Sequence, residues 1–232
     1  MPDDLTDTPS TTYPSAPGPA RADGLEREVG VGPWDGEWPD GDHYDPELLE
    51  RGDRRNVVDR YRYWRHEAIV ADLDTRRAPL HIAIQNWEHD FNIGSVIRTA
   101  NAFNVAAFHI VGRRRWNRRG AMVTDRYLHE EHHPDIDSLS RYARDRGLAI
   151  VAVDNVPGSV PIERCALPRE AVVLFGGEGP GLTRQARDAA ELCVHITQFG
   201  STRSMNAGAA AAIAMHTWAL QHVHRWRIPE VR

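Results

Sequence analysis

Short apolar runs alternate with helical stretches over the last two-thirds of the chain. The apolar runs occupy residues 80–84, 105–111, 148–153, 171–175 and 193–196. Helical spacing of apolar residues is found at 95–103, 138–146, 183–191 and 206–224. Unbroken apolar strands that alternate with helices are typical of a parallel sheet covered on both faces. The pattern therefore predicts an α/β fold, in which ligands bind beyond the carboxyl ends of the strands.

The first 44 residues show a different pattern. They are rich in Pro, Gly, Ser, Thr and Asp and contain few aliphatic side chains, so they have too little apolar surface to offset the entropy lost on ordering. The segment 1–44 is therefore predicted to be a disordered acidic tail. Residues 1–50 carry 2 Arg and 13 acidic residues, which leaves 26 Arg and 20 acidic residues in the remainder. The net charge of -5 thus hides a basic body that suits a polyanionic partner.

A helical extension is predicted at residues 45–78. Asp45 and Pro46 suit a helix cap and a first helical position, and apolar residues recur at helical spacing from about residue 54 onward. One or two helices, one of them amphipathic, are therefore expected before the α/β domain, which takes up residues 79–232. The protein is expected to be cytoplasmic, because the sequence shows no export signal and no apolar run long enough for a membrane helix.

The loop after the first predicted strand leads into a helix through residues 92–100, which read Asn-Ile-Gly-Ser-Val-Ile-Arg-Thr-Ala. Gly94 lets the turn pass into the helix, and Arg98 lies about one turn further on the same side. An arginine near a helix start can hold a phosphate or a developing negative charge. All 28 Lys and Arg residues are arginine. The absence of lysine excludes Schiff-base chemistry and the lysine of a phosphate-binding P-loop.

Two further loops combine polar side chains with small residues. Residues 176–182 place glycines on both sides of Glu178, which lets the backbone approach a ligand closely. They do not match the GxGxxG pattern of dinucleotide-binding folds. Residues 204–213 begin an Ala-rich helix with Ser204 and Asn206 at its mouth. Taken singly, the third loop is explained at least as well by a packed core helix. A tight turn is the alternative explanation of the second loop, although turns rarely need this many glycines around an acidic residue.

Together and in this order, the three loops resemble the three sequence motifs of the SpoU (TrmH) class within the SPOUT methyltransferase superfamily. NxGxxxRTA is matched at 92–100, the glutamate-glycine pattern at 176–182 and SxNxxxAAAI at 204–213. The resemblance implies a parallel-sheet domain with a C-terminal deep trefoil knot, which is rare among proteins. It further implies a homodimer that uses S-adenosylmethionine to methylate a ribose 2'-hydroxyl of tRNA or rRNA.

The same resemblance assigns residues. The catalytic group that it implies consists of Arg98, Asn92, Glu178, Ser204 and Asn206. The residues that it implies for cofactor binding are Gly176, Ile196, Gly200 and Met205. The sequence departs from the family pattern at Thr197 and Gln198, where relatives often have Pro-Met. It also departs at residues 205–208, where Met-Asn-Ala-Gly replaces Leu-Asn-Val-Ser and Gly208 lacks a hydroxyl.

Residues 112–120 place five arginines around one tryptophan directly after a predicted strand. Such a loop suits the binding of RNA phosphates, with the indole as a stacking face. The RNA-binding residues expected from it are Arg113, Arg114, Arg115, Trp116, Arg118 and Arg119. A solvated loop without a partner is the alternative.

Two other functions compete with a methyltransferase. His129, Glu130 and His133 satisfy the HExxH pattern of zinc peptidases, which requires a helix. Pro134 follows at once and disfavours that helix, so no metal site is expected. A non-catalytic RNA-binding module with the same fold is the second alternative, and it would not bind S-adenosylmethionine.

Overall fold

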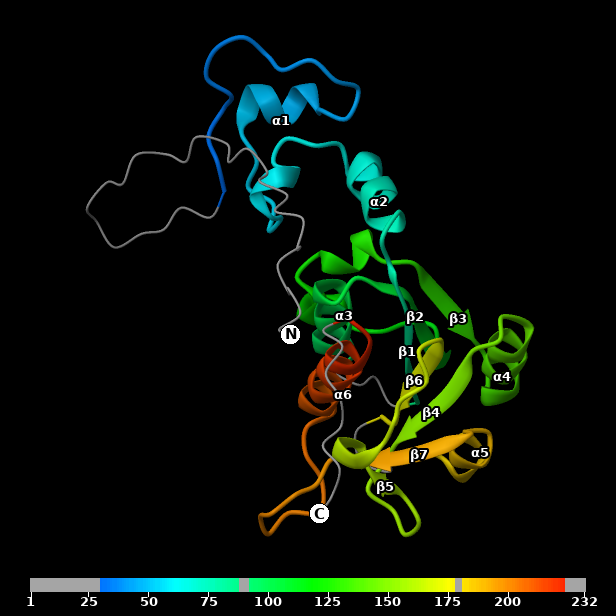
Figure 1. Cartoon of the computed structure of the whole chain (residues 1–232). Coiled ribbons are helices and arrows are strands. Elements are labelled where there is room, and N and C mark those ends of the chain that lie inside the picture. The colour runs from blue at the N-terminus through cyan, green and yellow to red at the C-terminus, as the bar shows by residue number, and fades with distance from the viewer. Residues whose placement is uncertain (1–29, 88–91, 178–180, 224–232) are drawn as a thin grey trace, which may run out of the picture. The chain divides into compact units, whose positions relative to one another are not determined.

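The structure, a computed structural model, describes residues 30–87, 92–177 and 181–223 (Figure 1). The chain divides into two compact units, Met1–Ile69 and Val70–Arg232, and the division falls within helix α2 (His66–Asp74). No helix in the described parts of the chain is both long and apolar enough to cross a membrane. The cytoplasmic location stays a prediction.

A seven-stranded sheet forms the centre of the second unit, with the strand order β3-β2-β1-β6-β4-β7-β5. Its strands are β1 (Ala78–Asn86), β2 (Val105–Gly112), β3 (Glu130–His133), β4 (Ala149–Val153), β5 (Val160–Pro161), β6 (Ala171–Phe175) and β7 (Leu192–His195). Every two neighbouring strands in this order run parallel. The predicted α/β class with a parallel sheet is confirmed, and all carboxyl ends meet at one edge.

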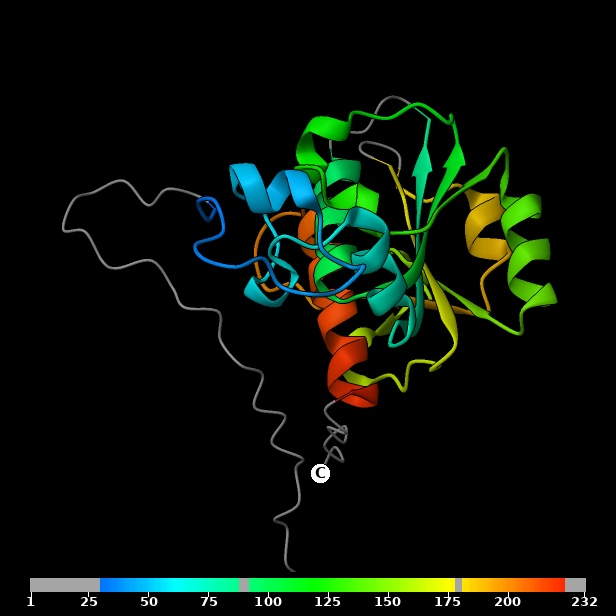
Figure 2. The ribbon, with the colours of Figure 1, turned by 90° about the horizontal axis from the view of Figure 1, so that it is seen from above.

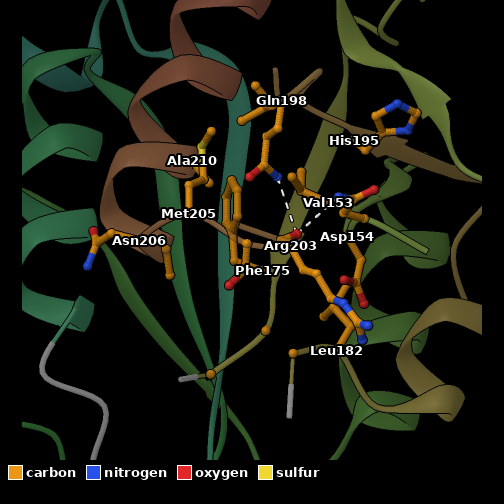
Figure 3. A pocket seen from close by; sticks show the side chains of 17 residues that line it. Val153, Asp154, Phe175, Leu182, His195, Gln198, Arg203, Met205, Asn206 and Ala210 are labelled. Atoms are coloured by element: carbon orange, nitrogen blue, oxygen red, sulfur yellow. Dashed lines mark hydrogen bonds between the residues drawn. The ribbon is translucent and has the colours of Figure 1, made fainter. Parts of the chain in front are cut away.

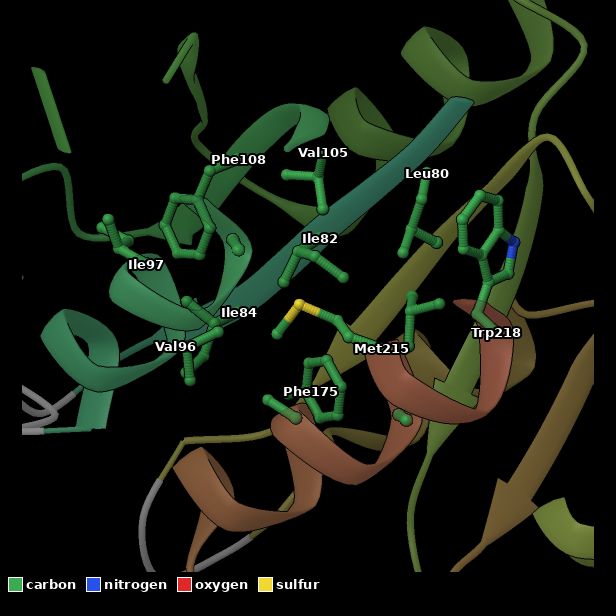
Figure 4. Close-up of a cluster of buried hydrophobic side chains, with 14 of the residues drawn as sticks. Leu80, Ile82, Ile84, Val96, Ile97, Val105, Phe108, Phe175, Met215 and Trp218 are labelled. Atoms are coloured by element: carbon green, nitrogen blue, oxygen red, sulfur yellow. The ribbon is translucent and has the colours of Figure 1, made fainter. Parts of the chain in front are cut away.

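Helices cover both faces of this sheet (Figure 2). Helices α3 (Asn92–Ala102) and α6 (Ala207–His222) pack on one face, and α4 (Ile136–Asp145) and α5 (Arg184–Asp188) pack on the other. Ile82 of β1 and Met215 of α6 lie at the centre of the first layer, with exposed fractions of 0% (Figure 4). Each aliphatic side chain buried in this way contributes roughly 1.5–3 kcal/mol, so burial of the apolar strands accounts for their alternation with helices.

Three short 3-10 helices complete this unit: η2 (Arg118–Ala121), η3 (Thr124–Tyr127) and η4 (Ile162–Arg164). The first two follow β2, and the third follows β5.

Three buried histidines form a chain of hydrogen bonds across neighbouring strands, on the face that α4 covers. His81 Nδ1 lies 2.9 Å from His109 Nε2, and His109 Nδ1 lies 2.9 Å from His133 Nε2. The chain ends at Ser138 of α4, whose Oγ lies 3.2 Å from His133 Nδ1. The Tyr142 ring contacts all three imidazoles edge-on. Buried imidazoles thus replace apolar side chains at this edge of the sheet.

Burial keeps these histidines neutral. It lowers the pKa of His81 to about 4, helped by the charge of Arg146. It also places the pKa of His109 well below the ordinary value, where the two flanking imidazoles and Arg146 act in the same direction. Burial lowers the pKa of His133 as well, against the opposing charges of Glu131 and Asp135.

We expect the free energy of unfolding to fall as the pH is lowered from about 7.5 to about 5. Above a pH of about 7.5, one unit above the ordinary pKa of histidine, the imidazoles are neutral in the folded and the unfolded chain, and they give no pH dependence. Below this pH the histidines of the unfolded chain become protonated, whereas the buried ones stay neutral. For His81 alone this difference lowers the free energy of unfolding by about 2 kcal/mol near pH 5. Urea unfolding at the two pH values checks this.

The matched variants for this measurement are His109→Leu, which removes the middle of the chain, and His216→Ala, which removes an exposed histidine of α6. The free energy of unfolding of the His109→Leu protein should depend less on pH than that of the wild type. The His216→Ala protein should show the same pH dependence as the wild type. An unchanged pH dependence in the His109→Leu protein would contradict the assignment.

The histidine chain also bears on the HExxH pattern. The residues of this pattern, 129–133, lie in strand β3 and directly before it, and not on a helix. His129 Nε2 is 2.9 Å from Asp74 Oδ1, while His133 is buried against His109. Within the described residues, no group of three or more His, Cys, Asp or Glu side chains is arranged to hold a metal ion. The peptidase alternative lacks the geometry that its chemistry needs.

Among the described residues of the first unit, the first helix is α1 (Pro46–Arg51), as predicted. Asp45 caps this helix, because its Oδ1 accepts a hydrogen bond from Glu47 N at 2.9 Å. Pro46 occupies the first turn, and Gly52 ends the helix with φ 88°. The predicted cap at Asp45 and the predicted first helical position at Pro46 are therefore confirmed.

The single helix expected from about residue 54 is wrong. The chain forms η1 (Asp59–Tyr61) and then the separate helix α2. The carboxylate of Asp53 is fully buried and accepts hydrogen bonds from Arg55 and from the backbone N–H of Tyr63, the latter at 3.0 Å. Tyr63 has φ +63°, which no continuous helix allows. The hydrogen bonds to the buried Asp53 carboxylate therefore determine the backbone path here, although the spacing of the apolar residues favours a helix.

The expected disorder through residue 44 is also wrong for residues 30–44. Val31 pairs with Asp53 through two backbone hydrogen bonds of 2.9 Å, and Trp34 N donates to Leu49 O at 2.8 Å. The Trp34 ring packs edge-on against Tyr63 at 5.3 Å. Aromatic rings supply the apolar area that a count of aliphatic residues misses. The tail at 1–29 lies outside the described residues.

Candidate active site

A cavity of about 850 Å³ opens beyond the carboxyl ends of β4, β6 and β7 (Figure 3). This is where a parallel sheet is expected to bind its ligand. Strands and the segments that follow them contribute Val153, Asp154, Asn155, Phe175, Gly176, Gly177, Gly181, Leu182, His195, Ile196, Gln198, Arg203 and Ser204. The start of α6 contributes Met205, Asn206, Ala207 and Ala210. The second and third of the predicted loops therefore meet in one cavity.

The first predicted loop joins them through two asparagines. Asn206 Nδ2 donates a hydrogen bond to Asn92 Oδ1 at 2.7 Å, which links the first residues of α6 and α3. Asn206 Oδ1 meanwhile accepts from Ala209 N at 3.1 Å and caps α6. Asn92 is buried, so this amide pair is held in place by its surroundings. One side chain thus caps a helix and positions a second motif.

The glycine-rich turn has no room for a side chain at its first residue. A Cβ atom added to Gly176 would lie 2.2 Å from the carbonyl carbon of Gly181 and 2.5 Å from Leu182 N. The turn is further fixed by the buried Gln85 of β1, which bonds to the backbone N–H and the hydroxyl of Thr183 at 2.9 and 3.0 Å. Gly176 is therefore required for the backbone packing of this turn, and the close approach to a ligand stays a prediction.

The loop between β7 and α6 is tied down at both ends. Glu163 accepts hydrogen bonds from the backbone N–H and the hydroxyl of Thr197 at 3.0 and 3.1 Å. Burial alone would raise the pKa of Glu163, but these bonds keep it below its ordinary value. At the other end the Arg203 carbonyl accepts from Asn155 Nδ2 at 3.1 Å and from Gln198 Nε2 at 3.5 Å (Figure 3). The two ends of this loop, where Gln198 and Arg203 line the cavity, are therefore anchored to neighbouring segments.

Residues 79–216 match the SpoU rRNA Methylase family. The chain belongs to this family.

Individual relatives agree with this assignment. A tRNA (guanosine(18)-2'-O)-methyltransferase of Thermus thermophilus is 24% identical over 159 residues, which cover 65% of this chain and 79% of the relative. A 23S rRNA (guanosine-2'-O-)-methyltransferase of Neisseria meningitidis is 24% identical over 196 residues, with coverages of 74% and 75%.

Solved structures show the same fold. The A. aeolicus TrmH/SpoU tRNA modifying enzyme superposes with a TM-score of 0.61 at 19% identity, covering 69% of this chain and 83% of its own. The SpoU methyltransferase AviRb from Streptomyces viridochromogenes, in complex with AdoMet, gives a TM-score of 0.57 at 21% identity, with coverages of 64% and 59%.

In this SpoU family chain, three of the four residues expected to bind the cofactor line the cavity. Gly176, Ile196 and Met205 line the cavity. Gly200 is not among the lining residues, because it lies in the exposed part of the loop beside Phe199, which is 96% exposed. Nothing lies within 4 Å of a Cβ atom added to Gly200, so no close contact explains the glycine.

The expected catalytic residues also differ in their placement. Asn92, Ser204 and Asn206 lie at or beside the mouth of the cavity. Arg98 is exposed on α3, six residues after Asn92 or about 9 Å along the helix axis, and it does not line the cavity. It makes no ion pair with another described residue, so its guanidinium is available for a ligand. Glu178 lies outside the described residues.

Gly208, which replaces the family serine, is explained by its neighbour on α3. A Cβ atom at Gly208 would lie 2.9 Å from Ser95 Oγ and 3.1 Å from Asn206 Oδ1. The hydroxyl of Ser95 thus occupies the space that a side chain at residue 208 would need.

Sequence reasoning missed several cavity residues, among them Asp154 and Asn155. Asp154 directly follows β4 and is the only carboxylate among the described lining residues. Its Oδ2 lies 3.4 Å from Arg187 Nη1, which leaves capacity for further hydrogen bonds. The sequence contained a signal for these two residues, because they are polar and directly follow an apolar strand, at the sheet edge where ligands bind.

The arginine-rich loop is held by Asn86, the last residue of β1. Asn86 Nδ2 donates to the carbonyls of Arg113 and Arg115 at 2.7 and 2.9 Å. The stacking face expected at Trp116 is wrong, because its indole is only 9% exposed and Arg118 covers it at 4.7 Å. The other arginines of the loop remain exposed, and their contact with RNA stays a prediction.

Proposed function

We propose that this chain is an S-adenosylmethionine-dependent methyltransferase that acts on a ribose 2'-hydroxyl of tRNA or rRNA. The observation that carries the proposal is that the second and third SpoU motif segments line one cavity at the carboxyl edge of the sheet, and that the hydrogen bond between Asn206 and Asn92 joins the first segment to them. The relatives at 24% identity are named as ribose methyltransferases of tRNA and rRNA, and one structural neighbour holds AdoMet.

The cavity fits the proposed cofactor. Its volume of about 850 Å³ lies within the usual range of pockets for ligands of this size. Phe175, Leu182 and Met205 offer apolar walls for an adenine ring, and Asp154 offers a carboxylate for hydroxyl or ammonium groups. Backbone groups at Gly176 and the other lining positions supply donors and acceptors. When bound, S-adenosylmethionine supplies a methyl group made electrophilic by the sulfonium charge.

The chain's own residues then have to orient a ribose and stabilise the charge that develops on its 2'-oxygen. We assign Arg98 to the phosphate beside the target ribose and to the incipient alkoxide. A guanidinium donates up to five hydrogen bonds and cannot accept one, so it suits this role better than that of a base. Asn92 and Asn206, joined at 2.7 Å, are assigned to orienting the ribose, together with Ser204. Glu178 stays in the proposed group by resemblance.

Selection of RNA over DNA follows from this chemistry, because DNA has no 2'-hydroxyl. The exposed arginines at 113–115 and 119 suit the phosphates of the same RNA. We propose that the activity resides in the segment 79–232, with the acidic tail and the helical extension as separate parts before it. The family match over residues 79–216 supports this division.

A homodimer is proposed as the working form. Helix α6 is apolar on nearly all sides, although a helix at a protein surface ordinarily has a polar outer face. Ala209 and Ile213 are exposed along it, the latter at 40%. A second copy of the chain would cover this stripe, and sedimentation velocity at micromolar concentration tests it.

We further propose the knotted path of the family for the C-terminal segment. The segment between β4 and β6 is tied to the final part of the chain at separated points. Glu163 accepts a hydrogen bond from Thr197 N, and Asn155 donates one to the Arg203 carbonyl. Gln221 of α6 donates to Cys165 O at 3.0 Å and accepts from Leu167 N at 2.9 Å. These contacts support a loop through which the chain passes before α6.

Isothermal calorimetry with S-adenosylmethionine, followed by mass spectrometric mapping of ribose methylation, tests the function. We expect saturable cofactor binding and one methylated nucleotide that is absent from the RNA of cells without the gene. RNA binding without any cofactor binding would instead favour the non-catalytic module. Binding of cofactor without a change in the methylation map would refute the proposed substrate.

A further inference from the structure

Two adjacent apolar side chains project from the segment that follows the arginine-rich loop. Met122 and Val123 lie between η2 and η3, and they are 59% and 55% exposed. Their neighbours are anchored in the protein, because Ala121 and Thr124 are buried on either side. The Thr124 hydroxyl donates to Ala121 O at 2.6 Å and closes the turn beneath the pair. We call Met122 and Val123 the apolar tip.

The backbone at the apolar tip is strained. Met122 has φ +49° and Val123 has φ +67°, a left-handed conformation that glycine and asparagine adopt readily. For a β-branched residue such as valine this conformation is rare and costly. Asn104 of the same chain, at φ +47°, follows the ordinary preference. The tip thus keeps two exposed apolar side chains where the backbone favours small or polar ones, which indicates a use for the side chains.

The apolar tip is fixed to the helix that carries the proposed catalytic arginine. A Cβ atom added to Gly94 of α3 would lie 2.6 Å from Ala121 N, so the two backbones are in direct contact. A Cβ atom on Gly120 would lie 3.2 Å from Gly94 Cα. The tip therefore holds a defined position relative to the start of α3, where Asn92 bonds to Asn206.

The charges around the apolar tip identify the class of partner. Arg118 is neutralised by Asp125 and Glu130, to which it bonds. The remaining arginines of the segment are exposed and form no ion pair with another described residue: Arg113, Arg114, Arg115, Arg119 and Arg126. A surface that combines an apolar point with uncompensated arginines is complementary to RNA, in which apolar base faces lie between phosphates.

We propose that Met122 and Val123 contact the faces of unstacked bases next to the target nucleotide, while the surrounding arginines hold the phosphates. Methionine and the branched aliphatic residues leucine and isoleucine serve as apolar wedges between bases in other nucleic-acid complexes, and valine offers a similar apolar surface. The contact holds the RNA against the start of α3 and so positions the ribose near Arg98. This inference rests on the proposed function, because it requires an RNA substrate.

The double variant Met122→Asn with Val123→Gly tests the proposal. It gives the two left-handed positions the residues that they favour, so the melting temperature should stay the same or rise. Its affinity for bulk tRNA and rRNA from cells lacking the gene should nevertheless fall about tenfold. The affinity is measured by filter binding at several salt concentrations. Met122→Ala, which leaves the backbone preference nearly unchanged, provides a second variant should the double variant unfold.

The salt dependence separates the apolar contact from the charges. Loss of the apolar tip should lower the affinity by the same factor at every salt concentration. The matched variant Arg114→Ala should instead reduce the slope of log K against log salt by about one phosphate contact. Cofactor affinity should be unchanged in both, since neither residue lines the cavity.

Wild-type RNA affinity and methylation in both tip variants would overturn the proposal and leave the proposed function intact. A changed oligomeric state with wild-type RNA affinity would overturn it too, because the tip would then be a protein contact. A wild-type protein that neither binds nor methylates RNA would overturn the proposed function and the tip contact together.

Discussion

Replacement of Arg98 by alanine should lower the rate of ribose methylation by about 100- to 1,000-fold, the usual cost of removing a group that stabilises developing charge. Affinity for S-adenosylmethionine should change by less than about twofold, because Arg98 lies outside the cavity lining. Single-turnover methylation and calorimetry measure the two quantities separately.

Two further variants sharpen this experiment. Arg98→Lys keeps the charge but loses the planar fork, so it should recover only part of the activity. Arg144→Ala removes an arginine that is 75% exposed on α4, on the opposite face of the sheet, and should act like the wild type. An Arg98→Ala protein with undiminished turnover would refute the assigned role.

A methyl group at residue 176 should have the second largest effect. In Gly176→Ala the new Cβ would lie 2.2 Å from a backbone carbon of Gly181, so the glycine-rich turn has to open. Forced repacking of this kind costs about 1–3 kcal/mol, which corresponds to a loss of cofactor affinity of about fivefold to 150-fold. Calorimetry with S-adenosylmethionine measures the loss, and thermal melting shows whether the fold survives.

Gly200 provides the matched control for this variant. It belongs to another segment of the same region, yet a Cβ atom there meets nothing within 4 Å. Gly200→Ala should therefore bind the cofactor as the wild type does. If Gly176→Ala bound equally well, the cavity described here would not be the cofactor site.

The sheet was predictable because its strands are apolar and buried on both faces. Strand β6 reads Ala-Val-Val-Leu-Phe and is buried at every residue, so the sequence signal is unambiguous. Strand β3 was missed because it reads Glu-Glu-His-His. Its buried His133 is satisfied by a hydrogen bond to another histidine, and no pattern of apolar residues reports such a pair.

The candidate site was predictable in its assembly but not in its details. Loops after parallel strands meet at one edge, so the meeting of residues 176–182 with 204–213 follows from topology. The burial of Trp116 does not follow, because an indole suits a core and a stacking face equally well. Nor does the bond between Asn92 and Asn206, which depends on the angle at which two helices meet.

That bond joins residues 114 positions apart in the chain. Ribosomes deliver the N-terminal part first, so α3 and most of the sheet emerge well before α6 is complete. Contacts between such distant segments also form slowly, because a long loop has to close. A nascent chain can therefore bury much of its core before the cavity is complete, and competence for catalysis arises only after α6 has been synthesised and has packed against α3.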